Sequence, residues 1–191
     1  MHAARNGHTD IVLLLLNKGA NLEAKDTAYG RTALLWAVVH SRNNTVQALL
    51  DKGANPGAKD KQGRTTLVTA VLHAKPDTLS LLLDRLGAQE QTAAEKPFLR
   101  FAAAGGRTDN IKVLLAKGED LNTRDQDGRT ALMWAAGAGK KEAVKLLLEL
   151  GADPNARDRE GKKALDMAKS DDKIMDLLFQ AEGKKPTPPE K

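Results

Sequence analysis

The sequence predicts an all-α protein, a solenoid of about five to six stacked helix–turn–helix repeats. A triplet of aliphatic residues with i, i+3, i+4 spacing recurs along the chain, and successive triplets start 34, 33, 32, 33 and 30 residues apart. That spacing places the side chains of one triplet on one face of a helix. The phrase GRTALLWAV at 30–38 returns as GRTALMWAA at 128–136 and, more weakly, as GRTTLVTAV at 63–71. Such a period is typical of repeat proteins, in which each unit packs on its neighbours.

The triplets mark the second helix of each predicted repeat. They are Val12/Leu15/Leu16, Val46/Leu49/Leu50, Leu79/Leu82/Leu83, Ile111/Leu114/Leu115, Val144/Leu147/Leu148 and Ile174/Leu177/Leu178. A glycine follows each triplet, and glycine just past a helix adopts the left-handed cap without a Cβ penalty. We therefore expect the second helices to end at Gly19, Gly53, Gly87, Gly118, Gly151 and Gly183.

A turn-rich segment, called a finger below, runs from each of these glycines to the first helix of the next repeat. The clearest fingers open with GANLEAKD (19–26), GANPGAKD (53–60), GEDLNTRD (118–125) and GADPNARD (151–158). They are dense in Asn, Asp, Pro and Gly, as tight turns require, so we expect β-hairpin-like loops. Thr32, Thr65 and Thr130 follow these fingers and are suited to cap the first helices.

The period assigns residues 1–183 to a single domain. Its predicted repeats cover 1–25, 26–59, 60–92, 93–124, 125–157 and 158–183, of which the first is abbreviated and the last is a cap. The finger expected at 88–97 lacks the usual Asp, Gly and Thr and is irregular. Residues 184–191, KKPTPPEK, are expected to form a disordered tail.

The composition narrows the classes of function. The chain has no cysteine, which excludes disulfides, thiol catalysis and cysteine-ligated zinc. Its net charge of +5 comes from 30 basic and 25 acidic residues that are mixed along the chain, without the dense basic block of a nucleic-acid-binding arm. No apolar run is long enough for a membrane span, and no signal peptide is visible. We expect a cytoplasmic protein; a secreted or periplasmic location stays open if a leader has been removed.

No catalytic residue, cofactor or metal is expected. The histidines at positions 2, 8, 40 and 73 have no carboxylates at ligand-like spacing, whereas zinc needs four convergent donors. GAGKKE at 137–142 lacks the order of a phosphate-binding loop, and no G-x-S-x-G motif is present. The sequence therefore favours a protein that is not an enzyme.

The recurring phrase resembles the ankyrin repeat. TALLWA (32–37), TTLVTA (65–70) and TALMWA (130–135) are similar to the T-P-L-H-x-A motif of that family, whose period is about 33 residues. GANLEAKD and GADPNARD are similar to the G-A-D-x-N-x-x-D turn of the family. The resemblance implies a non-catalytic scaffold or adaptor that binds another protein through its fingers and the concave face of its first helices. We also expect the chain to be a monomer.

This chain departs from the family motif in two ways. The proline is replaced by Ala or Thr, and the histidine by Leu35, Val68 and Met133. The usual histidine hydrogen bonds between repeats are therefore absent, and we expect aliphatic packing in their place.

Two basic ladders run along the predicted fingers. The first consists of Arg31, Arg64, Lys96, Arg129 and Lys162, and the second of Lys25, Lys59, Arg124 and Arg157. Stacked repeats would bring successive members about 8–10 Å apart, forming a basic stripe suited to an acidic partner surface. Alternatively, the turn aspartates Asp26, Asp60, Asp125 and Asp158 neutralise the ladders. The neighbouring Tyr29, Gln62, Gln126 and Arg159 would then set selectivity.

On the first helices, Val39, His40, Leu72 and His73 fall at equivalent places in adjacent repeats. They form either an exposed anchor for a partner or part of the core. Trp36 and Trp134 share one position and are interpreted as core-filling residues, although tryptophan is also favoured at binding hot spots.

Two alternative functions stay open. One is electrostatic binding of nucleic acid or another polyanion through the basic ladders, and the other is a binding module excised from a larger protein. Nucleic acid is the less favoured partner because neither aromatic stacking residues nor a groove-binding helix is evident. A membrane partner is not expected.

Overall fold

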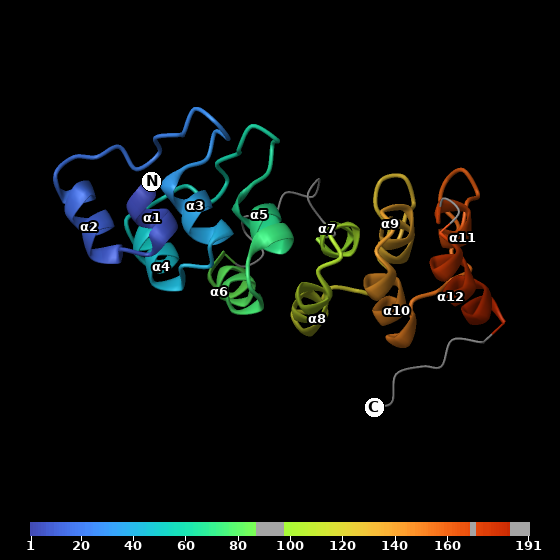
Figure 1. The fold of residues 1–191 in the computed structure, drawn as a ribbon. Helices are drawn as coiled ribbons and strands as arrows, with labels where there is room; N and C mark the ends of the chain where they lie inside the picture. Colours follow the sequence, from blue (N-terminus) through green and yellow to red (C-terminus); the bar gives the residue numbers. More distant parts are fainter. Residues whose placement is uncertain (87–97, 169–170, 184–191) are drawn as a thin grey trace. The chain divides into compact units, whose positions relative to one another are not determined.

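The computed structural model describes residues 1–86, 98–168 and 171–183. They belong to two compact units, one within Met1–Thr92 and the other within Ala93–Lys191. These described residues contain twelve helices and no strand (Figure 1). The predicted all-α fold is confirmed, whereas the assignment of 1–183 to a single domain stays a prediction.

The first unit contains three pairs of helices. They are α1 (His2–Asn6) with α2 (Thr9–Asn17), α3 (Ala33–Val39) with α4 (Asn43–Asp51), and α5 (Thr66–His73) with α6 (Pro76–Leu86). The first helices pack in a row, α1 on α3 and α3 on α5. The second helix α2 packs on α4, and in Figure 1 the loops before α3 and α5 extend beyond the first helices on the same side.

The second unit has the same organisation. Its pairs are α7 (Leu99–Ala104) with α8 (Thr108–Ala116), α9 (Ala131–Gly137) with α10 (Lys141–Glu149), and α11 (Ala164–Met167) with α12 (Asp172–Glu182). The first helices α7, α9 and α11 contact one another in that order, as do the second helices α8, α10 and α12. Each predicted repeat therefore holds two helices.

The aliphatic triplets supply the core between the two rows. Their first two members are fully buried in α4, α6, α8 and α10: Val46, Leu49, Leu79, Leu82, Ile111, Leu114, Val144 and Leu147. In α2, by contrast, Val12 is buried but Leu15 is 47% exposed. In α12 the buried residues are Ile174 and Leu178.

The first helices begin as the sequence predicts in two of three cases. The side-chain oxygens of Thr32 and Thr130 accept hydrogen bonds from the backbone N–H of Leu35 and Met133, at 3.3 and 3.4 Å. Thr65 is the N-cap residue of α5, but its side chain makes no cap hydrogen bond. The three residues that replace the family histidine (Leu35, Val68 and Met133) are buried, which confirms the expected aliphatic packing.

The predicted left-handed caps are present after four second helices. Gly19, Gly53, Gly118 and Gly151 have φ angles of 85°, 82°, 90° and 92°. The prediction is wrong for Gly183, which follows α12 with a φ of −80°. Gly87, the irregular finger at 88–97 and the tail at 184–191 lie outside the described residues. Within the part of the chain that is described, no helix has the length and apolarity needed to span a membrane.

Candidate protein-interaction surface

One aspartate carboxylate organises each of the four described fingers. Asp60 Oδ1 accepts hydrogen bonds from the backbone N–H of Gln62 and Arg64, at 2.9 and 3.0 Å. The backbone N–H of Asp60 in turn donates to the carbonyl of Arg64 at 3.1 Å, which closes the loop like a hairpin. Asp125 and Asp158 make the same set of bonds two and four residues further on. The fingers are therefore hairpin-like, although no strand forms in the described residues.

In two fingers a tryptophan binds the second carboxylate oxygen. Trp36 Nε1 donates to Asp26 Oδ2 at 3.0 Å, and Trp134 Nε1 donates to Asp125 Oδ2 at 2.7 Å. Both tryptophan side chains are half-buried. The tryptophans are therefore not part of the fully buried core, and each indole N–H finds the polar partner that it needs in the finger.

In the other two fingers an arginine takes the place of the indole. The repeats that follow carry Thr69 and Met167 at the tryptophan position. Asp60 Oδ2 instead accepts from Nε and Nη2 of Arg64, at 2.9 and 2.7 Å. Asp158 Oδ2 lies 3.5 Å from Nε of Arg129, which belongs to the preceding finger.

These contacts stabilise the charged form of the finger carboxylates. Burial alone would raise the pKa of Asp60, but the hydrogen bonds and the charge of Arg64 outweigh burial and lower the pKa below its ordinary value of 3.8. The pKa of Asp26 is also lowered, because the N–H groups of Tyr29, Arg31 and Trp36 outweigh burial. In Asp158, hydrogen bonds from Lys162, Glu160 and Arg129 likewise lower the pKa against the effect of burial.

The first basic ladder is largely paired with carboxylates. Arg31 is only 9% exposed, and its Nε lies 3.9 Å from Asp60 Oδ2. Arg64 binds Asp60 directly, and Arg129 pairs with Asp158. Lys162 Nζ lies 2.7 Å from Glu160 Oε2. Lys96 lies outside the described residues. The pairing favours the interpretation that acidic residues neutralise this ladder.

Three members of the second basic ladder donate to backbone carbonyls, two of them to the next finger. Lys25 Nζ donates to the backbone carbonyl of Lys59 at 2.7 Å, and Arg124 Nη1 donates to the carbonyl of Arg157. Arg157 Nη1 donates to the carbonyl of Gly161 at 2.7 Å. These cations therefore satisfy backbone acceptors, a structural role that the spacing in the sequence did not distinguish from partner binding.

The remaining predicted binding residues divide by exposure. Gln62, Gln126 and Arg159 are exposed at the fingers. Val39 and Leu72 are half-buried on the first helices, so they are neither core nor a fully exposed anchor. The exposed His73 has its Nε2 3.3 Å from Nη1 of Arg64. No group of three or more metal-ligating side chains occurs among the described residues.

The first unit carries a cluster of aromatic and arginine side chains. Some of these residues were predicted individually, but the sequence did not predict that they come together. This aromatic–arginine cluster consists of Arg5 on α1, Tyr29 and Arg31 in the finger, and Trp36 and His40 at α3. The rings of Tyr29 and Trp36 meet edge to face, with centroids 5.7 Å apart, and His40 stacks on Trp36 at 5.8 Å. Arg31 Cζ lies 4.8 Å and Arg5 Cζ 5.4 Å from the Trp36 centroid, within the range of cation–π contacts.

A cavity of about 270 Å³ lies beside this cluster. It is lined by Met1, His2, Arg5, Asp26, Ala28, Tyr29 and Trp36. Arg5 is exposed, and Tyr29 is 47% exposed. The sequence analysis did not predict Arg5 as a binding residue. The repeat period gives a signal for it, because Arg5 lies 34 residues before the predicted binding residue Val39 and so occupies the same position of its repeat.

Positive charge accumulates around His40 at the C-terminal end of α3. Burial lowers the pKa of His40 below its ordinary value of 6.5, and the charges of Arg5, Arg42 and Arg31 lower the pKa further. Arg42, at the start of α4, donates through Nε to the backbone carbonyl of Arg5 at 3.1 Å. The cluster and the adjacent Arg42 therefore join an aromatic surface to three arginines.

Stacked pairs of helices joined by hairpin-like fingers are typical of helical repeat proteins. The family described as ankyrin repeats (3 copies) matches residues 1–94 and 99–188, so the chain belongs to the ankyrin-repeat family. Ankyrin repeats are generally protein–protein interaction modules, and the family is typically non-enzymatic.

Individual relatives share the repeats but are much longer proteins. Mouse ankyrin repeat and SAM domain-containing protein 6 is 38% identical over 63 residues, which are 33% of this chain and 7% of that protein. The mouse B-cell lymphoma 3 protein homolog is 45% identical over 60 residues, 31% of this chain and 13% of that protein. A transient receptor potential cation channel subfamily A member 1 homolog of Caenorhabditis elegans is 30% identical over 129 residues, 68% of this chain and 8% of the channel.

A solved structure of similar size has the same fold. The crystal structure of the ankyrin repeat protein EF0377 aligns with a TM-score of 0.69 and 28% sequence identity. The alignment covers 94% of this chain and 95% of EF0377. The ankyrin-type solenoid fold predicted from the repeats is thereby confirmed.

Proposed function

We propose that this chain is a non-catalytic scaffold or adaptor that binds a partner protein through its fingers and first helices. The aromatic–arginine cluster carries this proposal. Binding hot spots are enriched in tryptophan, tyrosine and arginine, and they sit in well-packed pockets. In the first unit these residue types meet beside a cavity at the base of a finger.

The cluster is held in place before any partner binds. The carboxylate of Asp26 accepts from the backbone N–H of Tyr29 at 2.6 Å and from the indole of Trp36 at 3.0 Å. Arg31 contacts both rings, with its Cζ 4.9 Å from the Tyr29 centroid and 4.8 Å from the Trp36 centroid. A preorganised surface loses less conformational entropy on binding, which favours affinity.

The exposed finger residues would supply selectivity around this anchor. Gln62, Gln126 and Arg159 stand at the fingers with their side chains exposed. We further propose that the chain works as a monomer in the cytoplasm. Sedimentation velocity of the purified chain tests the monomer, and fractionation of the source cell tests the location.

Affinity capture from a lysate of the source cell, with proteins identified by mass spectrometry, tests the proposal. Tyr29→Ala removes an exposed ring of the cluster, and Gln47→Ala changes an exposed residue of the second helix α4 as a control. We expect a set of proteins that the wild-type chain and Gln47→Ala retain and that Tyr29→Ala loses. The proposal fails if all three chains retain the same proteins while circular dichroism shows them equally folded.

A further inference from the structure

We propose that the aromatic–arginine cluster and Arg42 bind an acidic segment of the partner protein. A carboxylate of that segment would lie against Arg5 and Arg42, and an adjacent apolar side chain would enter the cavity of about 270 Å³. This inference rests on the proposed function, because it names the chemistry of the partner that the cluster accepts.

The first observation is a local excess of positive charge. Arg5 and Arg42 are both exposed, and no carboxylate pairs with either of them within the described residues. This distinguishes them from Arg64 and Arg129, whose charges are neutralised by Asp60 and Asp158. Exposed, unpaired guanidinium groups suit carboxylate partners because they offer several N–H donors in a fixed fork.

The nearby acidic residue offsets only part of this excess, because its single negative charge faces the positive charges of Arg5, Arg31 and Arg42. The carboxylate of Asp26 lines the cavity, but it is already bound by the N–H groups of Tyr29, Arg31 and Trp36. Arg31 is only partly neutralised, since its contact with Asp60 is 3.9 Å long, Asp60 also binds Arg64, and the buried Nε of Arg31 makes no hydrogen bond in the described residues. Burial is the largest cause of the lowered pKa of His40, and the charges of Arg5, Arg42 and Arg31 lower the pKa further.

The second observation is the shape and lining of the cavity. Ala28 and the rings of Tyr29 and Trp36 give it apolar walls, and Arg5 stands beside them. Its volume is close to the lower end of the range of about 300–1,000 Å³ for small-molecule sites. A space of this size suits one apolar side chain, so the cavity and the arginines together favour a segment in which acidic and apolar residues alternate.

The arrangement favours a protein segment over a nucleic acid. Single-stranded nucleic acids bind by stacking bases on open aromatic faces and by tracking their phosphates along a groove of cations. Here the Trp36 ring already contacts Arg5, Arg31 and His40. Lys25 donates to a backbone carbonyl of the next finger, so it does not extend a cationic track from the cluster.

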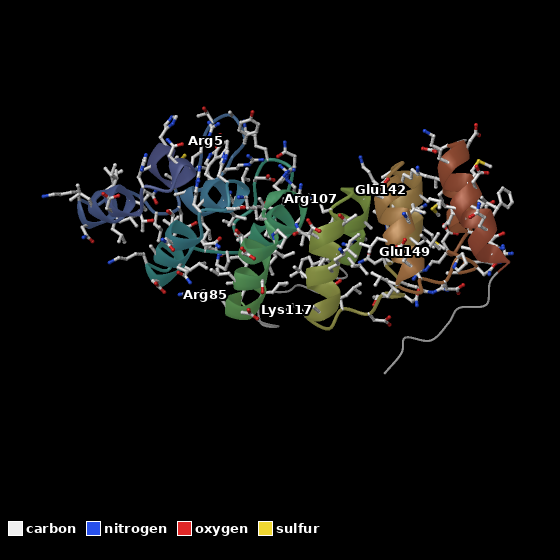
Figure 2. All side chains as sticks on the ribbon, turned by 60° about the horizontal axis from the view of Figure 1, so that its bottom comes forward. Arg5, Arg85, Arg107, Lys117, Glu142 and Glu149 are labelled. Carbon is white, nitrogen blue, oxygen red and sulfur yellow. The ribbon has the colours of Figure 1, made fainter. Side chains whose placement is uncertain are left out.

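Fluorescence anisotropy with a labelled peptide that alternates glutamate and leucine tests the inference. A peptide with glutamine in place of glutamate is the matched ligand, and Arg5→Ala and Arg5→Glu are the test variants. Arg85→Ala is the control: Arg85 is an arginine of the same unit that pairs with Asp51 on the second helices. Figure 2 shows Arg5 and Arg85 at opposite edges of the first unit.

We expect the glutamate peptide to bind the wild-type chain and the glutamine peptide to bind at least about tenfold more weakly, the loss expected for one charge-assisted hydrogen bond. Arg5→Ala should weaken the glutamate peptide by about tenfold, and Arg5→Glu by more, whereas Arg85→Ala should change affinity less than about twofold. Added salt should weaken binding.

Three results would overturn the inference. The first is equal binding of both peptides, or no binding of the glutamate peptide. The second is unchanged affinity in Arg5→Glu. The third is a thymidine oligonucleotide that binds more tightly than the glutamate peptide and displaces it, which would indicate a polyanion site.

The same Arg5→Glu chain in the lysate capture separates this failure from failure of the proposed function. If Arg5→Glu retains the proteins that Tyr29→Ala loses, the proposed protein binding stands, but the proposal of an acidic segment fails. If Tyr29→Ala loses nothing, the proposed function itself fails.

Discussion

Nε1 of Trp134 donates a hydrogen bond of 2.7 Å to Oδ2 of Asp125, and this bond ties helix α9 to the finger that precedes it. The other carboxylate oxygen of Asp125 holds the backbone of that finger. One side chain therefore sets both the shape of the loop and its position on the helix. In the first unit, Trp36 and Asp26 form the same bond at 3.0 Å.

Trp134→Phe tests this tie because it removes the N–H donor and keeps an aromatic ring. We expect the free energy of unfolding to fall by about 1–2 kcal/mol, since Asp125 loses a charge-assisted hydrogen bond in a half-buried position. Urea titration followed by circular dichroism measures the change. In a double-mutant cycle with Asp125→Asn, the two changes should be less than additive. Additive effects would show that the indole and the carboxylate do not interact.

The finger that contains Gly128 packs closely against the next finger, and Gly161 of the same unit provides a control without such a contact. Gly128 and Gly161 occupy equivalent finger positions, with φ angles of 78° and 79°. A Cβ on Gly128 would lie 3.2 Å from the backbone nitrogen of Arg159, whereas a Cβ on Gly161 would meet nothing within 4 Å. Both alanine variants should lose about 1–2 kcal/mol from left-handed backbone strain.

Gly128→Ala should lose a further 1 kcal/mol or so, because its methyl group presses on the backbone of the next finger. The backbone N–H of Arg159 also donates to the carbonyl of Asp127 at 2.9 Å, so the two fingers cannot separate without losing a hydrogen bond. Thermal unfolding of the two variants measures the difference. Equal midpoints for Gly128→Ala and Gly161→Ala would contradict the contact.

Leu147→Ala tests the core of the repeat stack. Leu147 is fully buried in α10, so its truncation should destabilise the chain by about 2–5 kcal/mol. Leu150, the exposed residue that ends the same helix, is the matched control, and Leu150→Ala should change stability by less than about 0.5 kcal/mol. Urea titrations of the two variants compare them. Similar losses for both would mean that the register of the repeat is wrong.

The helices were predictable from sequence because their signals are local and periodic. Leu79 and Leu82 have the spacing of one helix face, and both are buried as that spacing requires. Gly118 follows such a face and adopts the predicted left-handed cap. The exposure of Leu15 was not predictable from its own triplet, because it depends on which neighbour covers α2.

The site was less predictable because its residues come together only in three dimensions. Arg31 and Arg129 look alike in the repeated phrase, and each lies over the tryptophan ring of its own repeat. Arg31 also lies over the ring of Tyr29, a contact that the phrase does not show. Trp36 has the small, apolar neighbours of a core residue, and nothing in the phrase shows that its indole reaches Asp26. Arg5 belongs to another repeat, so its contact with Trp36 follows from stacking alone.

Acid should destabilise the chain through the finger carboxylates. The pKa of Asp60 in the folded chain is lower than 3.8, the ordinary value that applies to the unfolded chain. At pH values between the folded and the unfolded pKa, the unfolded state therefore binds more protons. The stability that Asp60 contributes is therefore fully present above about pH 3.8 and is lost as the pH falls through the folded pKa.

The dependence of the thermal midpoint on pH, measured for the wild-type chain and Asp60→Asn, tests this link. We expect the wild-type midpoint to drop with acid below about pH 4, and the drop to be shallower in Asp60→Asn, because the amide does not titrate. Two parallel curves would show that Asp60 makes no contribution to acid sensitivity.

Hydrogen–deuterium exchange on the chain, alone and in complex with a captured partner, asks directly which surface is used. We predict that bound partner slows exchange at residues 26–40, which span the finger with Tyr29 and the helix with Trp36, and leaves α4 unchanged. Slowed exchange confined to the second helices α2, α4 and α6 would contradict binding through the fingers and first helices.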